Sequence, residues 1–295
     1  MTTGQCIIDG VDIASIGAFI ERDGSNDLLM FPDRRKPDQN DWFESDGLEV
    51  DLSEVSFDAK KVAINYVIIA DDYTQFKQRL NIFQNIHYKP MMNIYIREYA
   101  TTFNLRYIQS SDYRHSGGYF NARKKIGNVK MDYWMDDPMQ LYTSAIASPV
   151  GDPSNITHVS IDNIDLSAYG ITVTEAYSSV LRPRGVKEVL TSKINSVDGQ
   201  VADNLQGIVG YPKRKANEVI IDCVMTAGSK NNLLINLNAL FNVVRKINAP
   251  LSLQLAGETI NCYYSKMSQF RKLTPFSRKV RVEFKLHLQE INRLN

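Results

Sequence analysis

The strongest constraint on the fold of this chain is an internal repeat. The segment Ile-Asp-Gly-Val-Asp-Ile at residues 8–13, followed by Gly17, recurs as Ile-Asp-Asn-Ile-Asp-Leu at residues 161–166, followed by Gly170. The interval is the same for both landmarks, since 161 − 8 and 170 − 17 both equal 153. A repeat of this length predicts two copies of one module, and therefore one fold built twice.

The similarity continues in the same order along the rest of both halves. Further segments correspond: 46–51 with 198–203, 61–67 with 218–224, 73–88 with 231–247, 102–107 with 259–264, and 129–135 with 280–286. The intervals drift by a few residues, as insertions in surface loops would cause. Each match is weak by itself, and chance similarity between two sandwich-like domains is the alternative. The shared order favours duplication.

Each half predicts the same combination of strands with one helix. Residues 60–70 are rich in β-branched and aromatic side chains, which favours a strand. The segment after it has an apolar face at helical spacing, made by Phe76, Leu80, Phe83 and His87 in the first half and by Leu233, Leu237, Leu240, Phe241, Val244 and Ile247 in the second. Alternating residues after Pro90 and Pro250 then predict a hairpin. The expected fold class is α+β, mainly β: two tandem modules, each an antiparallel β-sandwich or barrel with one packed α-helix.

The repeat also divides the chain into domains. A chain of 295 residues suffices for two ordinary domains, and we expect a first module at 1–138, a linker at 139–158 and a second module at 159–295. Pro149 and Pro153, among small polar residues, support the linker. No apolar run reaches the ~18–20 residues that span a bilayer. The polar N-terminus does not have the pattern of a signal peptide.

The two halves differ in charge. Residues 1–150 contain 16 Lys and Arg against 21 Asp and Glu, which gives −5, and residues 151–295 contain 18 against 12, which gives +6. The two values agree with the net charge of +1 for the whole chain. Surface variation without a role is one interpretation of this asymmetry. The other is that it favours contact between unlike modules.

The sequence shows no convergent set of catalytic or metal-binding residues. Its histidines are scattered without metal-ligand spacing: His87, His115, His158 and His287. We interpret His87 as part of a helix face and His287 as part of the polar side of the last strand. No glycine-rich loop follows a strand, so nucleotide binding has no support. We therefore expect no enzymatic activity, no cofactor and no metal.

Cysteines and basic clusters each allow a structural interpretation. Three widely spaced cysteines predict neither a disulfide framework nor a zinc site, and they favour folding in a reducing cytoplasm. Cys223 and Cys262 occupy strand positions, which favours burial over nucleophilic reactivity. The clusters at 34–36 and 123–125 suit phosphate contact. The acidic first half, however, favours solvated loops or an acidic protein partner over sequence-specific DNA binding.

A particular order of elements characterises the second half. It runs from Leu-Arg-Pro-Arg at 181–184 through a loop ending at 197–199, a strand at 218–225, a helix at 232–247, Asn-Ala-Pro at 248–250 and a hairpin closing on Tyr263 and Tyr264. This order resembles the tail-tube fold of bacteriophages, as found in tube proteins, in the belt domain of distal tail proteins and in baseplate hub proteins. The first half is similar, with a longer first loop. Common distal tail proteins continue with a carbohydrate-module-like domain that this chain lacks, so tube, distal ring and hub all stay open.

The resemblance implies a structural protein of a phage or phage-like tail, made in the host cytoplasm and located in the virion. Such a protein forms a ring around the DNA channel at the tube or its distal end or baseplate, and joins tube to tip. A near-neutral chain suits non-specific passage of DNA, because each phosphate contact adds affinity. Three chains would form a pseudo-sixfold ring in which the −5 and +6 halves alternate. Six chains in a ring is the other arrangement.

Loops that project from the modules are the candidate subunit interfaces. The loop at 31–47 contributes Arg34, Arg35, Lys36, Trp42 and Phe43, the loop at 110–127 contributes Tyr119 and Arg123, and the loop that begins at residue 181 contributes Arg182, Arg184 and Lys187. In the resemblance these loops contact other copies of the chain and neighbouring tube, hub or baseplate proteins. No membrane partner is expected.

A different class of function is the main alternative. Two tandem β-sandwich domains also suit a binding module that recognises a carbohydrate or a protein surface at a tail tip. That function predicts exposed aromatic residues gathered in one cleft, and the available candidates are Trp42, Phe43, Tyr113 and Tyr119. In a structural subunit the same residues are buried at subunit contacts. An enzyme is the third alternative.

Overall fold

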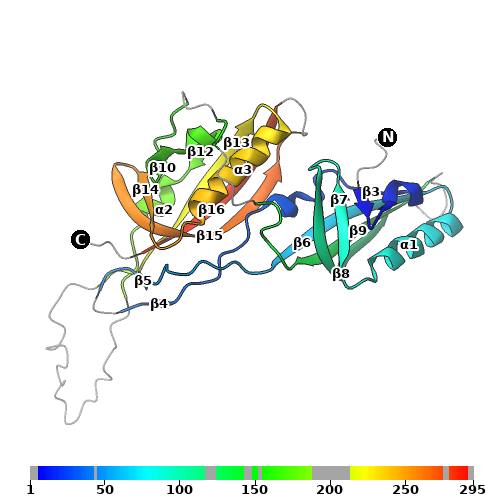
Figure 1. Ribbon diagram of the computed structural model, residues 1–295, viewed down its shortest axis with the longest axis horizontal. Coiled ribbons are helices and arrows are strands. Elements are labelled where there is room, and N and C mark those ends of the chain that lie inside the picture. Colours follow the sequence, from blue (N-terminus) through cyan, green and yellow to red (C-terminus); the bar gives the residue numbers. More distant parts are fainter. Residues whose placement is uncertain are drawn as a thin grey trace, which may run out of the picture.

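The protein forms two antiparallel β-modules, one from each half of the chain. Their structure is a computed structural model that describes residues 6–42, 45–116, 124–142, 148–151, 155–187, 213–274 and 279–291. Each module contains a seven-stranded sheet with one long helix packed against it (Figure 1). This confirms the predicted fold class, which is α+β and mainly β.

The first sheet has the strand order β2-β1-β7-β8-β9-β6-β3. Its strands are β1 (Cys6–Ile8), β2 (Val11–Asp12), β3 (Ala18–Ile20), β6 (Lys60–Ala70), β7 (Met92–Ile96), β8 (Thr101–Ser116) and β9 (Lys125–Met135). Apolar residues alternate along β6, and Ile64, Tyr66 and Ile68 are fully buried. This period of two is what turns one face of the sheet toward the core.

The second sheet repeats this topology with the order β11-β10-β14-β15-β16-β13-β12. Its strands are β10 (Ser160–Ile161), β11 (Ile164–Asp165), β12 (Ile171–Glu175), β13 (Glu218–Ala227), β14 (Leu251–Leu255), β15 (Glu258–Lys272) and β16 (Val280–Glu290). When the strands of each half are taken in chain order, the two sheets correspond strand for strand. Even the irregularities agree, because β8 has a bulge after Tyr107 and β15 has one after Tyr264.

The repeated segment that opens each half closes its sheet by the same local structure. Asp12 caps the short helix η1 (Ile13–Ile16) by accepting from the backbone of Ala14, and Asp165 caps η3 (Leu166–Tyr169) in the same way. Gly17 and Gly170 end these helices with identical left-handed dihedrals, φ 70° and ψ 20°, which favour glycine. Because η1 and η3 connect the two edge strands of their sheets, each sheet curls toward a barrel.

The two long helices also begin alike. Helix α1 (Tyr73–His87) is capped by the Asp72 side chain and α3 (Lys230–Val244) by the Ser229 side chain. The predicted apolar faces are confirmed: Phe76, Phe83 and His87 are buried in α1, and Leu233, Leu237, Leu240, Phe241 and Val244 are buried in α3. Ile247 lies beyond the end of α3 and is exposed. None of the helices in the described segments is long and apolar enough to cross a membrane.

The structure corrects one prediction about the periphery of the modules and adds detail to two others. Strand β8 continues to Ser116, so the loop predicted at 110–127 is much shorter than its sequence indicated. His287 lies on the polar side of β16, as its sequence position indicated, and it is buried there with Ser268 and Glu218 hydrogen-bonded to its two ring nitrogens. The linker also packs, since Tyr142 is buried and donates to the Leu29 carbonyl oxygen. The division at 138/139 and 158/159 stays a proposal.

Candidate functional site: the interface between the modules

A long excursion of the first module, which we call the first arm, contacts the second module. It comprises residues 31–58 and includes the hairpin of β4 (Gln39–Asn40) and β5 (Glu49–Val50). Figure 1 shows β4 and β5 beneath β14 and β15 of the second module, far from α1 of their own module. The first arm therefore leaves its own sheet and covers the other one.

The second module has an arm with the same base. In the first arm, the backbone of Asp58 donates to Asp33 and that of Arg35 donates to Ser56. In the second arm, the described parts of which are residues 182–187 and 213–217, Lys215 donates to Gly185 and Lys187 donates to Lys213. A single bridge lies inside each pair, Arg34 with Phe57 and Val186 with Arg214. This pattern establishes that Arg34 and Val186 hold equivalent positions.

An aromatic cluster anchors the first arm on the second module. The Phe31 ring, which is 1% exposed, lies 4.9 Å from the Phe241 ring of α3 and 6.2 Å from the Tyr264 ring of β15. Tyr142 closes the cluster from the linker, with its ring 5.3 Å from Phe31 and 4.5 Å from Phe241. The Phe57 ring at the other end of the arm lies 5.3 Å from Phe241. Large buried aromatic groups of this kind dominate the energetics of an interface.

Hydrogen bonds then fix the register of the first arm against strand β15. The Arg34 backbone N–H donates to the Ser265 carbonyl oxygen over 2.9 Å, and the Tyr264 hydroxyl donates to the Pro32 carbonyl oxygen over 3.0 Å. Ser265 is the bulge residue of β15, which leaves its carbonyl outside the ladder with β16. On the side of β15 opposite β16, pairing with β14 ends at Cys262, which pairs with Leu251. After Cys262, no described strand pairs with this side of β15. The first arm therefore covers an otherwise open strand edge.

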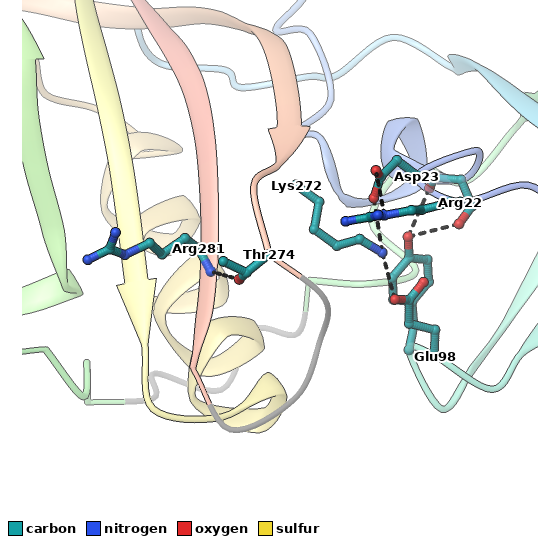
Figure 2. Close-up of polar contacts among 8 residues, drawn as sticks. Arg22, Asp23, Glu98, Lys272, Thr274 and Arg281 are labelled. Carbon is teal, nitrogen blue, oxygen red and sulfur yellow. Dashed lines mark hydrogen bonds and ion pairs between the residues drawn. The ribbon is translucent and has the colours of Figure 1, made fainter.

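A buried ammonium group joins the ends of the two sheets. The Lys272 side chain at the end of β15 is 5% exposed, and its Nζ lies 2.6 Å from Glu98 Oε1 and 3.3 Å from Asp23 Oδ1 of the first module (Figure 2). Both acids are about one-third exposed, at 37% and 34%. Opposite charges this close, with the cation removed from solvent, couple the modules electrostatically.

The two arms also contact each other. The Lys187 side chain is 6% exposed, and its Nζ donates to the carbonyl oxygens of Trp42 and Gly47 at 2.6 and 2.7 Å while pairing with the Asp41 carboxylate at 2.6 Å. The backbones of Gly47 and Arg214 add a hydrogen bond of 2.9 Å. One cation thus satisfies three oxygen acceptors of the first arm, which holds its tip beside the second arm.

The structure brings several of the predicted interface residues together, but between modules of one chain. Arg34 is buried with its guanidinium 5.2 Å from the Tyr263 ring centroid of the second module, whereas Arg184 pairs with Glu290 at 2.7 Å within the second module. The other predicted residues in the described part are exposed, except for Lys187: Arg35, which pairs with Asp58, and Lys36, Trp42 and Arg182. Phe43, Tyr119 and Arg123 lie outside the described residues, as does the segment 197–199. A role of these residues between subunits stays a proposal.

Sequence reasoning missed the residues that matter most at this interface. Phe31 marked only the start of the loop predicted at 31–47, and Glu98 was not singled out within the hairpin predicted after Pro90. The available signal was hydrophobicity, because Phe31 ends the apolar run Leu28-Leu29-Met30-Phe31 immediately before Pro32. A large aromatic residue at the point where an apolar run enters a charged loop indicates an anchor that is buried by another part of the molecule.

The described residues offer little reactive chemistry. No group of three His, Cys, Asp or Glu side chains in them is arranged to hold a metal ion. All three cysteines are buried, and burial raises the pKa of the Cys6 thiol to about 12 and those of Cys223 and Cys262 further. Burial lowers the pKa of Lys60 to about 7, but its Nζ donates to the Met30 carbonyl oxygen beneath the base of the first arm. These groups stabilise the fold and do not converge on a shared cleft.

An apolar pocket opens in the first module between α1 and β8. Its volume is about 200 Å³, and it is lined by Leu80, Gln84, His87, Tyr88, Tyr107, Ser110, Tyr113, Val129 and Met131. His87 is 1% exposed, with Nδ1 2.7 Å from the Phe83 carbonyl oxygen and with no hydrogen-bond partner at Nε2 among the described residues. Nδ1 is therefore the protonated nitrogen, and Nε2 retains an unused acceptor lone pair.

Burial of His87 makes the first module sensitive to acid. Desolvation lowers the pKa of His87 from 6.5 to about 4, so the unfolded chain binds a proton that the folded chain rejects between these values. The free energy of unfolding is therefore expected to fall as pH drops below about 6.5, by about 2 kcal/mol at pH 5. Urea denaturation between pH 7.5 and 5 measures this loss. A His87→Leu variant is expected to lack this loss of stability, whereas an Ile82→Ala variant on the exposed face of α1 is expected to keep it. If the free energy of unfolding changed equally with pH in both variants, His87 would not be the group responsible.

Comparison with known proteins gives limited similarity. No protein-family model matches the chain, and no curated protein matches it. Among solved structures, it is similar to the crystal structure of the SPP1 Dit (gp 19.1) protein, described as a paradigm of the hub adsorption apparatus in phages that infect Gram-positive bacteria. The sequence identity is 11%, the TM-score is 0.35, and the similarity covers 97% of this chain and 98% of that chain.

Proposed function

We propose that this chain is a structural subunit of a phage or phage-like tail, which forms a ring around the DNA channel at the tube or its distal end or baseplate. Two observations support the proposal. The order of elements resembles the tail-tube fold, and the two modules have the same strand order. The described residues contain buried interface contacts in place of a reactive cleft. The protein would act in the virion by joining the tube to the tip.

One observation carries the proposal furthest: the two modules are docked, not merely tethered. The first arm covers the open edge of β15 with a buried aromatic anchor and hydrogen bonds, and Lys272 adds an ion pair with Glu98 of the first sheet's hairpin. Because these contacts join the two modules, they fix the orientation of one sheet relative to the other. If the same contact recurs between chains, it is heterologous, and such contacts form a closed ring when the rotation between modules closes. Three chains then supply six modules.

The alternative function, recognition of a carbohydrate or protein surface, has less support. Its candidate aromatics in the described part are Trp42 and Tyr113, and they lie on different parts of the first module, the first arm and strand β8. Trp42 is 51% exposed on the first arm, where its indole donates to Glu49 at 2.6 Å, whereas Tyr113 is 47% exposed beside the α1 pocket. They do not form one cleft. Tyr119 and Phe43 lie outside the described residues.

Imaging the purified chain tests the structural proposal. Negative-stain electron microscopy is expected to show closed rings or short tubes at high protein concentration, and native mass spectrometry is expected to give a mass of three chains. The mass of six chains would replace the trimer by the hexameric arrangement. Monodisperse single chains that bind immobilised glycans would instead support the recognition function and contradict the structural one.

A further inference from the structure

The first module has an open strand edge at the position that the first arm covers in the second module. In β8, the stretch from Gln109 to His115 is exposed, and only β9 pairs with it among the described strands. Ile108 is the bulge residue of β8, as Ser265 is of β15. The carbonyl oxygen of Ser265 accepts from the first arm, but in the described part of the chain no backbone N–H of another loop or arm donates to that of Ile108. Both modules therefore have this acceptor edge, and among the described residues the first arm covers only the edge of the second module.

The pocket between α1 and β8, which we call the α1 pocket, adjoins this open edge. It corresponds to the place between α3 and β15 of the second module that the Phe31 ring occupies. Tyr107 holds the same place in β8 as Tyr264 in β15, and Gln84 holds the same place in α1 as Phe241 in α3. In the second module Tyr264 and Phe241 contact Phe31, whereas in the first module their counterparts line an unfilled pocket. The free Nε2 acceptor of the buried His87 lies in the wall of this pocket, so a hydrogen-bond donor is also missing.

In the second module, apolar residues next to and within the base of the second arm are exposed. The first arm is preceded by η2 (Asn26–Leu29), where Leu28 and Leu29 are 1% and 0% exposed. The second arm is preceded by α2 (Tyr177–Leu181), and there Leu181 is 66% exposed. Val186, the counterpart of Arg34, is 54% exposed. Exposed apolar residues at positions whose counterparts are buried indicate a surface that is covered in the assembly.

We infer that the open β8 edge and the α1 pocket of one copy receive the α2 and second-arm base of a second copy of this chain. The occupant is a second copy because the same contact already exists inside the chain, between the first arm and β15. Each chain thus has two donor surfaces, the first arm and the base of the second arm, and two acceptor surfaces, the edges of β15 and β8. The first arm and the β15 edge contact each other within the chain, and the other two surfaces are left for contact between copies. The inference rests on the proposed ring function and specifies the contact that would join its subunits.

The contacts inside the chain predict those between copies. By equivalence with Tyr264 and Pro32, the Tyr107 hydroxyl of one copy donates to the Arg184 carbonyl oxygen of the next. By equivalence with Arg34 and Ser265, the Val186 backbone N–H donates to the Ile108 carbonyl oxygen. In the same register Pro183 is the counterpart of Phe31, so Pro183 and the nearby Leu181 enter the α1 pocket. The adjacent Arg182, which is exposed and carries five N–H donors, supplies the hydrogen bond that His87 Nε2 lacks.

Disulfide trapping tests this contact directly. Residues joined by one backbone hydrogen bond have Cα atoms about 5–6 Å apart, within reach of a disulfide. An equal mixture of Val186→Cys and Ile108→Cys chains is expected to form a covalent dimer under mild oxidation, and each variant alone is expected to form none. The native cysteines do not interfere, since all three are buried. The doubly substituted chain Arg34→Cys/Ser265→Cys is the matched control, because it places the equivalent pair within one chain.

Exposed apolar positions provide a second test that does not disturb the core. Leu181→Asp on the donor and Tyr113→Asp on the acceptor are each expected to raise the dissociation constant of self-association at least about thirty-fold, as loss of a central apolar contact does. Ile164→Asp, an exposed apolar position of β11 outside both surfaces, is the matched control and is expected to leave assembly unchanged. Analytical ultracentrifugation measures all three, and circular dichroism checks that each variant is folded.

The outcomes separate the inference from the proposed function. Rings that form while the cysteine pair fails to cross-link, or while Leu181→Asp and Tyr113→Asp assemble as the wild type does, would overturn the docking inference and leave the ring function standing. Cross-linked chains that grow into open filaments would support the docking and contradict the ring. Failure of the cysteine pair to cross-link, together with wild-type chains that do not assemble at any concentration, would overturn both.

Discussion

Replacement of Phe31 by alanine is expected to lower the free energy of unfolding by about 3–5 kcal/mol, the usual cost of deleting a fully buried phenylalanine. The ring is 1% exposed and contacts aromatic groups from the linker, from α3 and from β15. Its loss leaves a cavity at the meeting point of both modules. Urea denaturation followed by tryptophan fluorescence and circular dichroism measures the effect.

The Phe31→Ala variant also distinguishes docking from general stability. Because the arm loses its anchor, amide exchange is expected to accelerate at Arg34, whose N–H donates to Ser265, more than in the core strand β6. Ile82→Ala, at a position of α1 that is 46% exposed, is the control and is expected to change stability by less than about 1 kcal/mol. A Phe31→Ala chain as stable as this control would show that the arm does not couple the modules.

Removal of both acids around Lys272 is expected to destabilise the protein more than removal of the lysine itself. The double substitution Asp23→Asn/Glu98→Gln takes both carboxylates from an ammonium group that is 5% exposed, at an expected cost of about 3–5 kcal/mol. Lys272→Met leaves two carboxylates that are about one-third exposed and that water can solvate. Its expected cost is smaller, about 1–2 kcal/mol.

A neighbouring surface pair provides the comparison for this asymmetry. Arg271 pairs with Glu283 on the same sheet at 2.6 Å, but the two side chains are 66% and 34% exposed. Arg271→Met is therefore expected to cost no more than about 1 kcal/mol and to lose that effect in high salt. Chemical denaturation of all variants at low and high ionic strength tests the order. Equal costs for the acid double variant and Arg271→Met would show that Lys272 does not couple the modules.

Local sequence patterns determined the elements of each module. Alternation in 92–96, with polar and apolar residues facing opposite sides, predicted a strand that the structure places at Met92–Ile96. The apolar spacing of Phe76, Phe83 and His87 predicted the helix face that packs on the sheet. The Asp and Gly of the repeated segment recur because a side-chain cap and a left-handed residue are needed at fixed positions. These signals span only a few residues, so one sequence suffices to detect them.

The association of the two modules was decided by tertiary structure alone. Lys272 and Glu98 are 174 residues apart, and Tyr264 and Pro32 are 232 residues apart, so no local period links them. Phe31 stands at the start of a charged segment that predicts a solvated loop, and contacts with α3 and β15, far away in the sequence, bury its ring. The sequence by itself determined that one module is built twice, because hydrogen bonding and hydrophobic periodicity act over short distances. Which arm covers which edge was decided by packing between surfaces far apart in the chain, since burial depends on shape and position that only the folded molecule supplies.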